Sequence, residues 1–533
     1  MLDQSMQTPT PLSASFTWTK IDLFFGLLQA LCLLCVVCQV CIDSSVDNLN
    51  CVALVALSSS LVFQYLWRSG APRDYPISSL AVLGLCVTTQ YAALVAQTLG
   101  WTSFIQLLRW PMVTFGVLAA VQILAVGTHW VYRHLAVTQS ISKLIATKVL
   151  TPMGALSVPP ISTIWLMALL GAISTATAGG IATGDVGGKA FQALAFMTYM
   201  PFLIPIYHRR YGQAYCDIKK QGPLLLAYVA LLVLIAMVRN SRQLMAIGPV
   251  QAGLIFLIYS LQDSTPITRR TIARLMTLTV ATSVATVLFS NLAIAMVINR
   301  DKIEILKPLE LIEETLRTLT DQPRLEQHQK DALATAKLKR YDETYLASPV
   351  ISRFSETKFH DNNIFVATTT TDSERQEIWN LTGDMLLATM PQPVLDALDI
   401  KIQKNDLRFT FGDFNRYLTE GPDATLGGYA TGSIWGHVIA LFGLGWAPLV
   451  VALILLPSYV VLDAFSRPSG GFDIAPMVMC STWIIFIYGL GGESLVFHIG
   501  FYTRDLPQRL VLYCAVYAGI HHGWRLIKGR AFA

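Results

Sequence analysis

The stretch from Ile434 to Leu462 reads IWGHVIALFGLGWAPLVVALILLPSYVVL and contains no aspartate, glutamate, lysine or arginine. A helix needs about 20 mostly apolar residues to cross the hydrocarbon core of a bilayer. This stretch is long enough, so it predicts a membrane-spanning helix. Because lipid offers the backbone no hydrogen-bond partners, a helix also satisfies its own peptide groups there.

Eleven further stretches show the same apolar pattern, at residues 22–42, 51–67, 76–98, 110–132, 158–182, 189–207, 222–238, 243–261, 275–298, 475–491 and 507–524. Together the stretches predict an all-α polytopic membrane protein with about twelve transmembrane helices. Of the 533 residues, 53% are hydrophobic and 14% are charged, against about 25% charged in soluble proteins. This composition excludes a disordered chain, a nucleic-acid-binding tail protein and a conventional soluble enzyme.

The charged residues concentrate between the ninth and tenth expected spans. Residues 300–433 hold 16 Lys/Arg and 22 Asp/Glu, a net charge of −6, whereas the other 399 residues hold 23 and 12, a net charge of +11. We therefore expect two membrane portions, 1–299 and 434–533, and one loop domain at 300–433. Apolar residues at helical spacing in 306–319 and the helix-start signal at Asp372 predict a mainly helical loop domain. Residues 364–366 fit a short strand.

Lysine and arginine in short loops indicate the orientation, because they favour the cytoplasmic side. With a cytoplasmic N-terminus, the inner segments carry 17 Lys/Arg and the short outer loops carry six. We therefore expect both termini in the cytoplasm and the 300–433 loop outside. The N-terminus lacks the features of a cleaved signal peptide, so the first span is expected to be an anchor.

Two motifs resemble cofactor sites, but neither predicts one. Cys32, Cys35, Cys38 and Cys41 are spaced by three residues within an apolar span, and on a helix such thiols drift around the axis and do not converge on one ion. The segment GDVGGK at 184–189 lacks the first glycine and the Ser/Thr of a phosphate loop. We expect no cofactor and no metal.

Basic residues at the outer ends of the spans need an explanation, because they oppose the positive-inside tendency. Arg239 and Arg242 lie in the short connection AMVRNSRQLMAIG, and Arg504 and Arg509 lie before the last span in FYTRDLPQRL. Arginine binds phosphate through two parallel hydrogen bonds and stays charged when desolvated. A lipid pyrophosphate would explain these arginines. Lipid headgroup contacts and ion pairs such as Arg504–Asp505 are the alternative.

His437 begins the span after the loop domain, beside Trp435. An ionisable residue within a membrane segment is a candidate functional residue. It could act as a general base toward a sugar hydroxyl. A hydrogen bond to a neighbouring helix is the alternative.

Several passages together resemble bacterial oligosaccharide repeat-unit polymerases of the Wzy type and, more distantly, O-antigen ligases. In the loop domain they are SRFSE, from Ser352 to Glu356, and MLLATMPQPVLDAL, from Met385 to Leu398. The small-residue turn GGYATGSIWGH ends at His437 and is followed by FGLG, from Phe442 to Gly445. The large outer loop and the outward arginines are also similar to this family.

The resemblance implies metal-independent glycosyl transfer of the GT-C type on the outer face of a bacterial inner membrane. The substrate would be an undecaprenyl-pyrophosphate-linked oligosaccharide, and a chain-length regulator and a flippase are the implied partners besides membrane lipids. The arginines, with Arg353, would hold the pyrophosphate. His437 would be the base, with Glu493 and Asp413 as further candidates. Sugar rings would stack on aromatic residues, for which the candidates are Trp379, Tyr417, Tyr429 and Trp435.

Two other functions remain open. A ligase would share the donor but transfer the finished glycan to another acceptor. A transporter or flippase is the alternative from a different class, and such proteins carry binding sites near the bilayer midplane. The expected spans hold few charges at mid-depth, which favours the enzyme.

Overall fold

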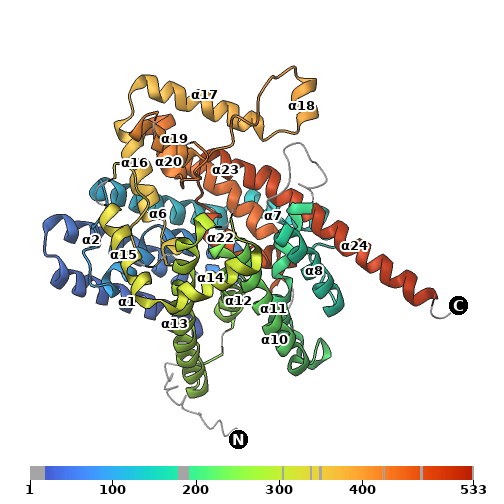
Figure 1. Ribbon diagram of the computed structural model, residues 1–533. Helices are drawn as coiled ribbons and strands as arrows, with labels where there is room; N and C mark the ends of the chain where they lie inside the picture. The colour runs from blue at the N-terminus through green and yellow to red at the C-terminus, as the bar shows by residue number, and fades with distance from the viewer. Residues whose placement is uncertain are drawn as a thin grey trace, which may run out of the picture.

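A computed structural model describes residues 19–177, 191–263, 265–302, 305–336, 339–346, 348, 351–422, 424, 426–468 and 472–530. These residues are mainly helical, and the only strands among them are β1 (Ser466–Pro468) and β2 (Phe472–Ile474), which pair antiparallel (Figure 1). The expected all-α class is confirmed. Eight of the twelve stretches that the sequence predicts as spans correspond to long apolar helices among the described residues, and the total of twelve spans stays a prediction.

Eight described helices are long and apolar enough to cross a membrane. They are α1 (Lys20–Ile42), α2 (Val46–Arg68), the continuous helix α4–η1–α5 (Pro76–Leu99), α6 (Pro111–His134), α11 (Ile218–Val238), α12 (Arg242–Gln262), α13 (Arg269–Ile298) and α20 (Ile434–Ala464). Each corresponds to one expected span. Within α20, Gly443 of the FGLG passage has φ +67 and interrupts the helical geometry, a conformation that glycine adopts without steric cost.

Within the described residues, the other four expected spans correspond to helices that are shorter or more polar. They are α8 (Ile161–Thr177), the 3-10 helix η3 (Ala193–Leu203) with α10 (Ile204–Tyr211), the pair α21 (Pro476–Met479) and α22 (Thr482–Tyr488), and α24 (Leu506–Arg530). Residues 476–479 are all buried within the protein. A short apolar run cannot be told from a buried core segment by pattern alone. The GDVGGK segment lies outside the described residues.

The loop domain 300–433 is helical, as expected. Its helices are α14 (Pro308–Thr320), α15 (Gln322–Ala336), α16 (Thr357–Thr369), α17 (Asp372–Ala388), α18 (Gln392–Ala397) and α19 (Phe411–Glu420). The expected start near Asp372 is confirmed, because the Thr371 side chain accepts the N–H of Glu374 and caps α17. The expected strand at 364–366 is wrong. These residues belong to α16, which begins with a run of buried polar residues before them and continues to Thr369.

The loop helices pack individually against the candidate membrane-spanning helices. Helix α14 packs against α11 and α13, and α16 packs against α20 and α6. In Figure 1, α17, α18 and α19 lie together at one end of the molecule, while α16 descends toward α6. Buried residues of the loop, such as Ile364 and Phe411, belong to the same hydrophobic core as Trp435 of α20. The loop and the helix bundle therefore share one core.

Candidate functional site

A cavity of about 270 Å³ lies where the loop domain meets α12 and α13. Its lining combines charged, polar and apolar side chains, namely Arg242, Ile294, Val297, His328, Gln329, Ala332, Leu333, Glu343, Thr344, Leu346, Ser352 and Phe359. A concave site with a few polar groups on an apolar lining is typical of ligand-binding pockets. The loop domain supplies most of this lining, so the site exists only when the loop is folded onto the bundle.

Arg242 is the first residue of α12 and reaches this cavity from a tight, anchored turn. Helix α11 ends at Val238, and the chain reverses through Asn240, which has φ +46. The Asn240 side-chain amide donates to the carbonyl of Met296 at 3.0 Å and ties the turn to α13. The expectation that the connection is short is confirmed. Arg239, the C-cap of α11, is half-buried beside it.

The other predicted arginines lie elsewhere. Arg504 is exposed in η7 (Phe501–Asp505), and Arg509 is half-buried in α24 with one guanidinium nitrogen enclosed and unbonded among the described residues. The side chain of Arg353 is outside the described part of the chain. Neither η7 nor α24 contributes a described lining residue to the cavity. The cavity therefore contains Arg242 but not the second arginine pair.

Glu343 lines the cavity and also contacts the loop that precedes α20. Its carboxylate lines the cavity and accepts the backbone N–H of Thr431 at 2.5 Å. Thr431 belongs to the GGYATGS passage that the sequence singled out. The structure thus brings a carboxylate that the sequence analysis missed to the same cavity as Arg242. A glutamate in an acidic segment carries no sequence signal that distinguishes it from its solvated neighbours.

Asp413 organises the neighbouring loop. Its carboxylate accepts backbone N–H groups from Thr410, Gly427, Tyr429 and Ala430 at 2.8 to 3.3 Å. It is 1% exposed. A carboxylate that accepts several backbone N–H groups holds that backbone in place. Asp413 therefore stabilises the conformation of the loop.

Glu493 lies against the same loop. It is half-buried and accepts the N–H of Gly412 at 3.1 Å. Burial raises the pKa of this carboxyl. The loop passes so close that a Cβ on Gly432 would lie 2.2 Å from the backbone oxygen of Glu493. Glu493 and Asp413 therefore both accept backbone N–H groups around the start of α19.

His437 has no nitrogen available for a substrate in this conformation. Its Nδ1 accepts the N–H of Leu495 at 3.2 Å, so its proton lies on Nε2, which contacts the Thr382 hydroxyl at 2.7 Å. The ring stacks on Phe411, with centroids 3.8 Å apart, and is fully buried. The hydrogen bond to a neighbouring helix, the alternative left open by the sequence, is what the structure contains. A general base must reach the proton that it removes.

The four aromatic candidates differ in accessibility. Trp435 is 1% exposed and Tyr417 is half-buried beside Phe414. Trp379 is 42% exposed and donates its indole N–H to the carbonyl of Leu441, and Tyr429 is 70% exposed. Stacking on a sugar needs an open ring face. Tyr429 and Trp379 therefore offer such faces, and Trp435 does not.

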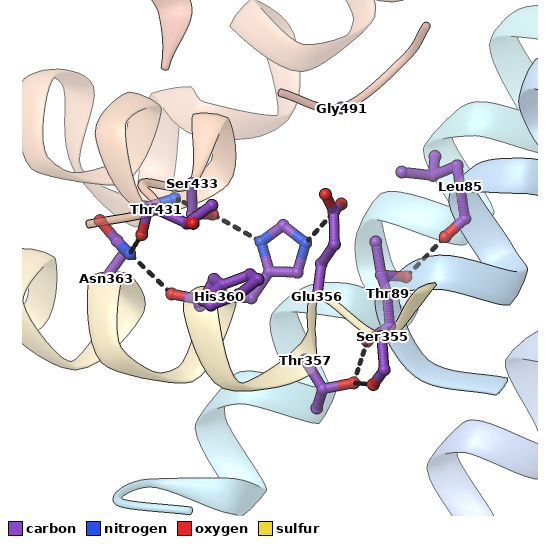
Figure 2. A network of polar contacts seen from close by, with 12 residues as sticks. Leu85, Thr89, Ser355, Glu356, Thr357, His360, Asn363, Thr431, Ser433 and Gly491 are labelled. Carbon is purple, nitrogen blue, oxygen red and sulfur yellow. Dashed lines mark hydrogen bonds and ion pairs between the residues drawn. The ribbon is translucent and has the colours of Figure 1, made fainter. Parts of the chain in front are cut away.

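A polar network in α16 escaped the sequence analysis (Figure 2). His360 Nδ1 lies 2.7 Å from the Ser433 hydroxyl, and its Nε2 lies 3.9 Å from the Glu356 carboxylate. Burial raises the pKa of Glu356 to about 8 and lowers that of His360 to about 3, so both side chains are uncharged near pH 7. The SRFSE passage ends at Glu356, but no sequence signal indicated that the polar residues after it are buried.

Among the described residues, no group of three or more His, Cys, Asp or Glu side chains is arranged to hold a metal ion. The four cysteines spaced by three residues in α1 are free and range from buried to exposed. No protein-family model, no curated protein and no solved structure matches this chain.

Proposed function

We propose that this protein polymerises undecaprenyl-pyrophosphate-linked oligosaccharide repeat units by glycosyl transfer at a membrane surface. The observation that carries the proposal is the cavity in which Arg242, His328 and Glu343 meet at the end of two apolar helices. A lipid-linked substrate needs both an apolar body beside the membrane and a cation at its phosphate. The resemblance of several passages to repeat-unit polymerases and the acidic loop domain support the same function.

The proposed membrane arrangement completes the eight candidate spans with α8, the η3–α10 segment, α21–α22 and α24, giving about twelve crossings. Both termini are cytoplasmic, and residues 300–433 face the outer side of a bacterial inner membrane. The excess of Lys/Arg in the inner segments supports this orientation. The turn with Arg239 and Arg242 then lies at the outer surface, where a lipid pyrophosphate would be bound.

The chemistry assigns one role to each charged group. The acceptor hydroxyl attacks the sugar carbon that carries the pyrophosphate, the bond from carbon to the pyrophosphate oxygen breaks, and its electron pair leaves with the pyrophosphate. Arg242, with Arg239, stabilises the charge that develops there. Glu343 takes the proton of the hydroxyl. This base replaces His437, whose ring nitrogens are both engaged.

The loop domain orders the acceptor and limits access of water to the donor, because hydrolysis would compete with transfer. Tyr429 and Trp379 are its exposed aromatic residues near the GGYATGS passage and α20. They are suited to bind sugar rings of the acceptor. In this proposal, Asp413 and Glu493 hold the loop in place and take no part in proton transfer.

The test uses the full-length protein in nanodiscs with a lipid-linked repeat unit as the only substrate. We expect longer glycans in the wild type, and a loss of at least about 100-fold in turnover for Arg242→Gln and for Glu343→Gln. Arg317→Gln and Glu377→Gln change exposed side chains of the same loop domain and serve as controls with wild-type turnover. Unchanged lengthening in both site variants overturns the proposal. A glycan transferred whole to a different acceptor identifies a ligase.

A transporter is favoured by one other observation. Ser78 donates to Asp463 at 2.5 Å and contacts His129 at 2.8 Å, all three within candidate spans. Asp463 also lines a cavity of about 470 Å³ that includes Asp74 and Lys143. Buried ionisable groups in spans mark transport pathways. Flipping of the lipid-linked unit in proteoliposomes, lost in Asp463→Asn, would establish the transporter instead.

A further inference from the structure

A second cavity at the loop domain, of about 330 Å³, lies beside the cavity of Arg242. Its lining is rich in cations and consists of Gln106, Leu107, Leu108, Arg109, Ala336, Lys339, Asp342 and Lys358. Consecutive residues line the two cavities. Asp342 lines this cavity and Glu343 lines the cavity of Arg242; likewise, Lys358 lines this cavity and Phe359 lines that of Arg242. The two cavities therefore share a thin wall.

Arg109 is held in place at this second cavity but lacks a full set of partners. Its guanidinium lies 5.0 Å from the centre of the Phe365 ring, and its Nη1 is enclosed without a hydrogen-bond partner among the described residues. Its backbone N–H donates to Asp361 at 2.7 Å. The main chain is thus fixed independently of the side chain, and an enclosed guanidinium N–H without an acceptor is costly.

Two lysines add to the positive charge. Lys358 is 4% exposed; its ammonium donates to the carbonyl of Leu107 at 2.6 Å and to Asp361 at 3.3 Å. Lys339 is 3.9 Å from Asp342 and its side chain is 55% exposed. The lining thus holds three cations and one carboxylate, Asp342. Asp361 and Glu420 lie close enough to act on Arg109, and Asp361 also accepts backbone N–H groups. Burial lowers the pKa of both Arg109 and Lys358, as expected of cations without full compensation.

We propose that this cavity binds a phosphate group through Arg109, Lys339 and Lys358. A guanidinium offers two parallel N–H donors to phosphate oxygens, and lysine ammoniums add point charges around them. A bound phosphate balances the excess positive charge of the cavity lining. The inference goes beyond the proposed function, because none of these three residues takes part in the transfer chemistry assigned above.

Binding of inorganic phosphate to the full-length protein in phosphatidylcholine nanodiscs tests this site by calorimetry. The double variant Arg109→Gln/Lys339→Gln is expected to lose at least about tenfold in affinity, because it removes two charge-assisted interactions. Lys330→Gln removes an exposed charge of α15 and keeps wild-type affinity. If the double variant fails to fold, Lys339→Gln alone, at an exposed position, is expected to lose about threefold.

A second arm identifies the source of the phosphate. The protein is placed in nanodiscs that contain phosphatidic acid, and the lipid retained after detergent washing is measured by native mass spectrometry. Retention by the wild type and loss in the double variant support a lipid headgroup; phosphate binding without lipid retention supports a free phosphate. The proposal is overturned if neither probe binds, or if the double variant binds both as the wild type does. Both readouts are independent of glycan transfer.

Discussion

The carboxylate of Asp361, in the loop domain, accepts the backbone N–H of Arg109 at 2.7 Å across 252 residues of sequence. It also accepts the N–H of Trp110 at 2.9 Å and the hydroxyl of Thr114 at 3.1 Å. Asp361 therefore connects α16 to the start of α6. This one side chain shows how closely the loop domain is joined to the membrane helices.

Removal of this carboxylate should destabilise the protein strongly. Asp361→Ala leaves two backbone N–H groups without their acceptor and removes the carboxylate that faces the buried ammonium of Lys358, at a cost of about 3–5 kcal/mol in the free energy of unfolding. Thermal unfolding in detergent measures the effect. Asp384→Ala changes an exposed carboxylate of α17 and should leave the midpoint within about 1 °C. Equal midpoints for the two variants would contradict the role of Asp361.

Glu356 should make stability fall as the pH rises. Burial raises the pKa of its carboxyl to about 8, above the value of about 4.3 in an unfolded chain. The folded state thus holds a proton that the unfolded state has lost, and stability decreases from about pH 4.3 up to pH 8. His360, whose pKa is lowered to about 3 by burial, opposes this trend only below about pH 6.5.

Between about pH 6.5 and 8, Glu356 therefore changes the stability with pH and His360 does not. Unfolding titrations should show that the stability of Glu356→Gln relative to the wild type rises by about 1.4 kcal/mol per pH unit, or about 2 kcal/mol in total. Glu377→Gln, at an exposed position, should show no such trend. A constant difference between Glu356→Gln and the wild type across this window would exclude a protonated Glu356.

The hydroxyl of Ser78 should contribute to the stability of the bundle. It bridges Asp463 and His129, and its backbone N–H also donates to Asp463 at 3.0 Å. Ser78→Ala leaves a buried imidazole nitrogen and a carboxylate oxygen short of a partner, at a cost of about 1–3 kcal/mol. Chemical unfolding in detergent measures this. Ser140→Ala, which removes an exposed hydroxyl, should cost less than about 0.5 kcal/mol.

Gly84 should not tolerate a side chain. A Cβ at this position would lie 1.8 Å from the carbonyl oxygen of Phe486 in α22. Gly84→Ala must separate α4 from α22, so we expect a lower yield of monodisperse protein and a loss of about 3 kcal/mol or more. Gly116→Ala has open space in α6 and should be neutral or stabilising, because alanine favours helices. A normal midpoint for Gly84→Ala would show that the two helices do not pack this closely.

The apolar spans and the arginine turn were accessible from the sequence. The run from Ile434 to Leu462 predicts α20, and the few residues between two apolar runs predict the turn with Arg239 and Arg242. Segments 475–491 and 189–207 are less decided by the same reasoning, because a helix buried in protein and a helix in lipid have the same apolar composition.

The polar sites could not be predicted in the same way. His437 carried a signal, but whether its ring was open or bonded depended on Thr382 and Leu495, which are 55 and 58 residues away. Glu343 and Glu356 look like any glutamate of an acidic loop. One lines the cavity of Arg242, and the other is buried beside His360.

The amino-acid order was sufficient to indicate helices that are long and apolar enough to cross a membrane, because apolar transfer free energy adds up over about 20 neighbouring residues and needs no distant partner. The tertiary structure decided which polar groups act together. A buried charge such as Asp361 is stable only when its donors arrive from elsewhere in the chain. Arg109 and Trp110, just before α6, supply these donors. The sequence pattern does not show that they lie close to Asp361.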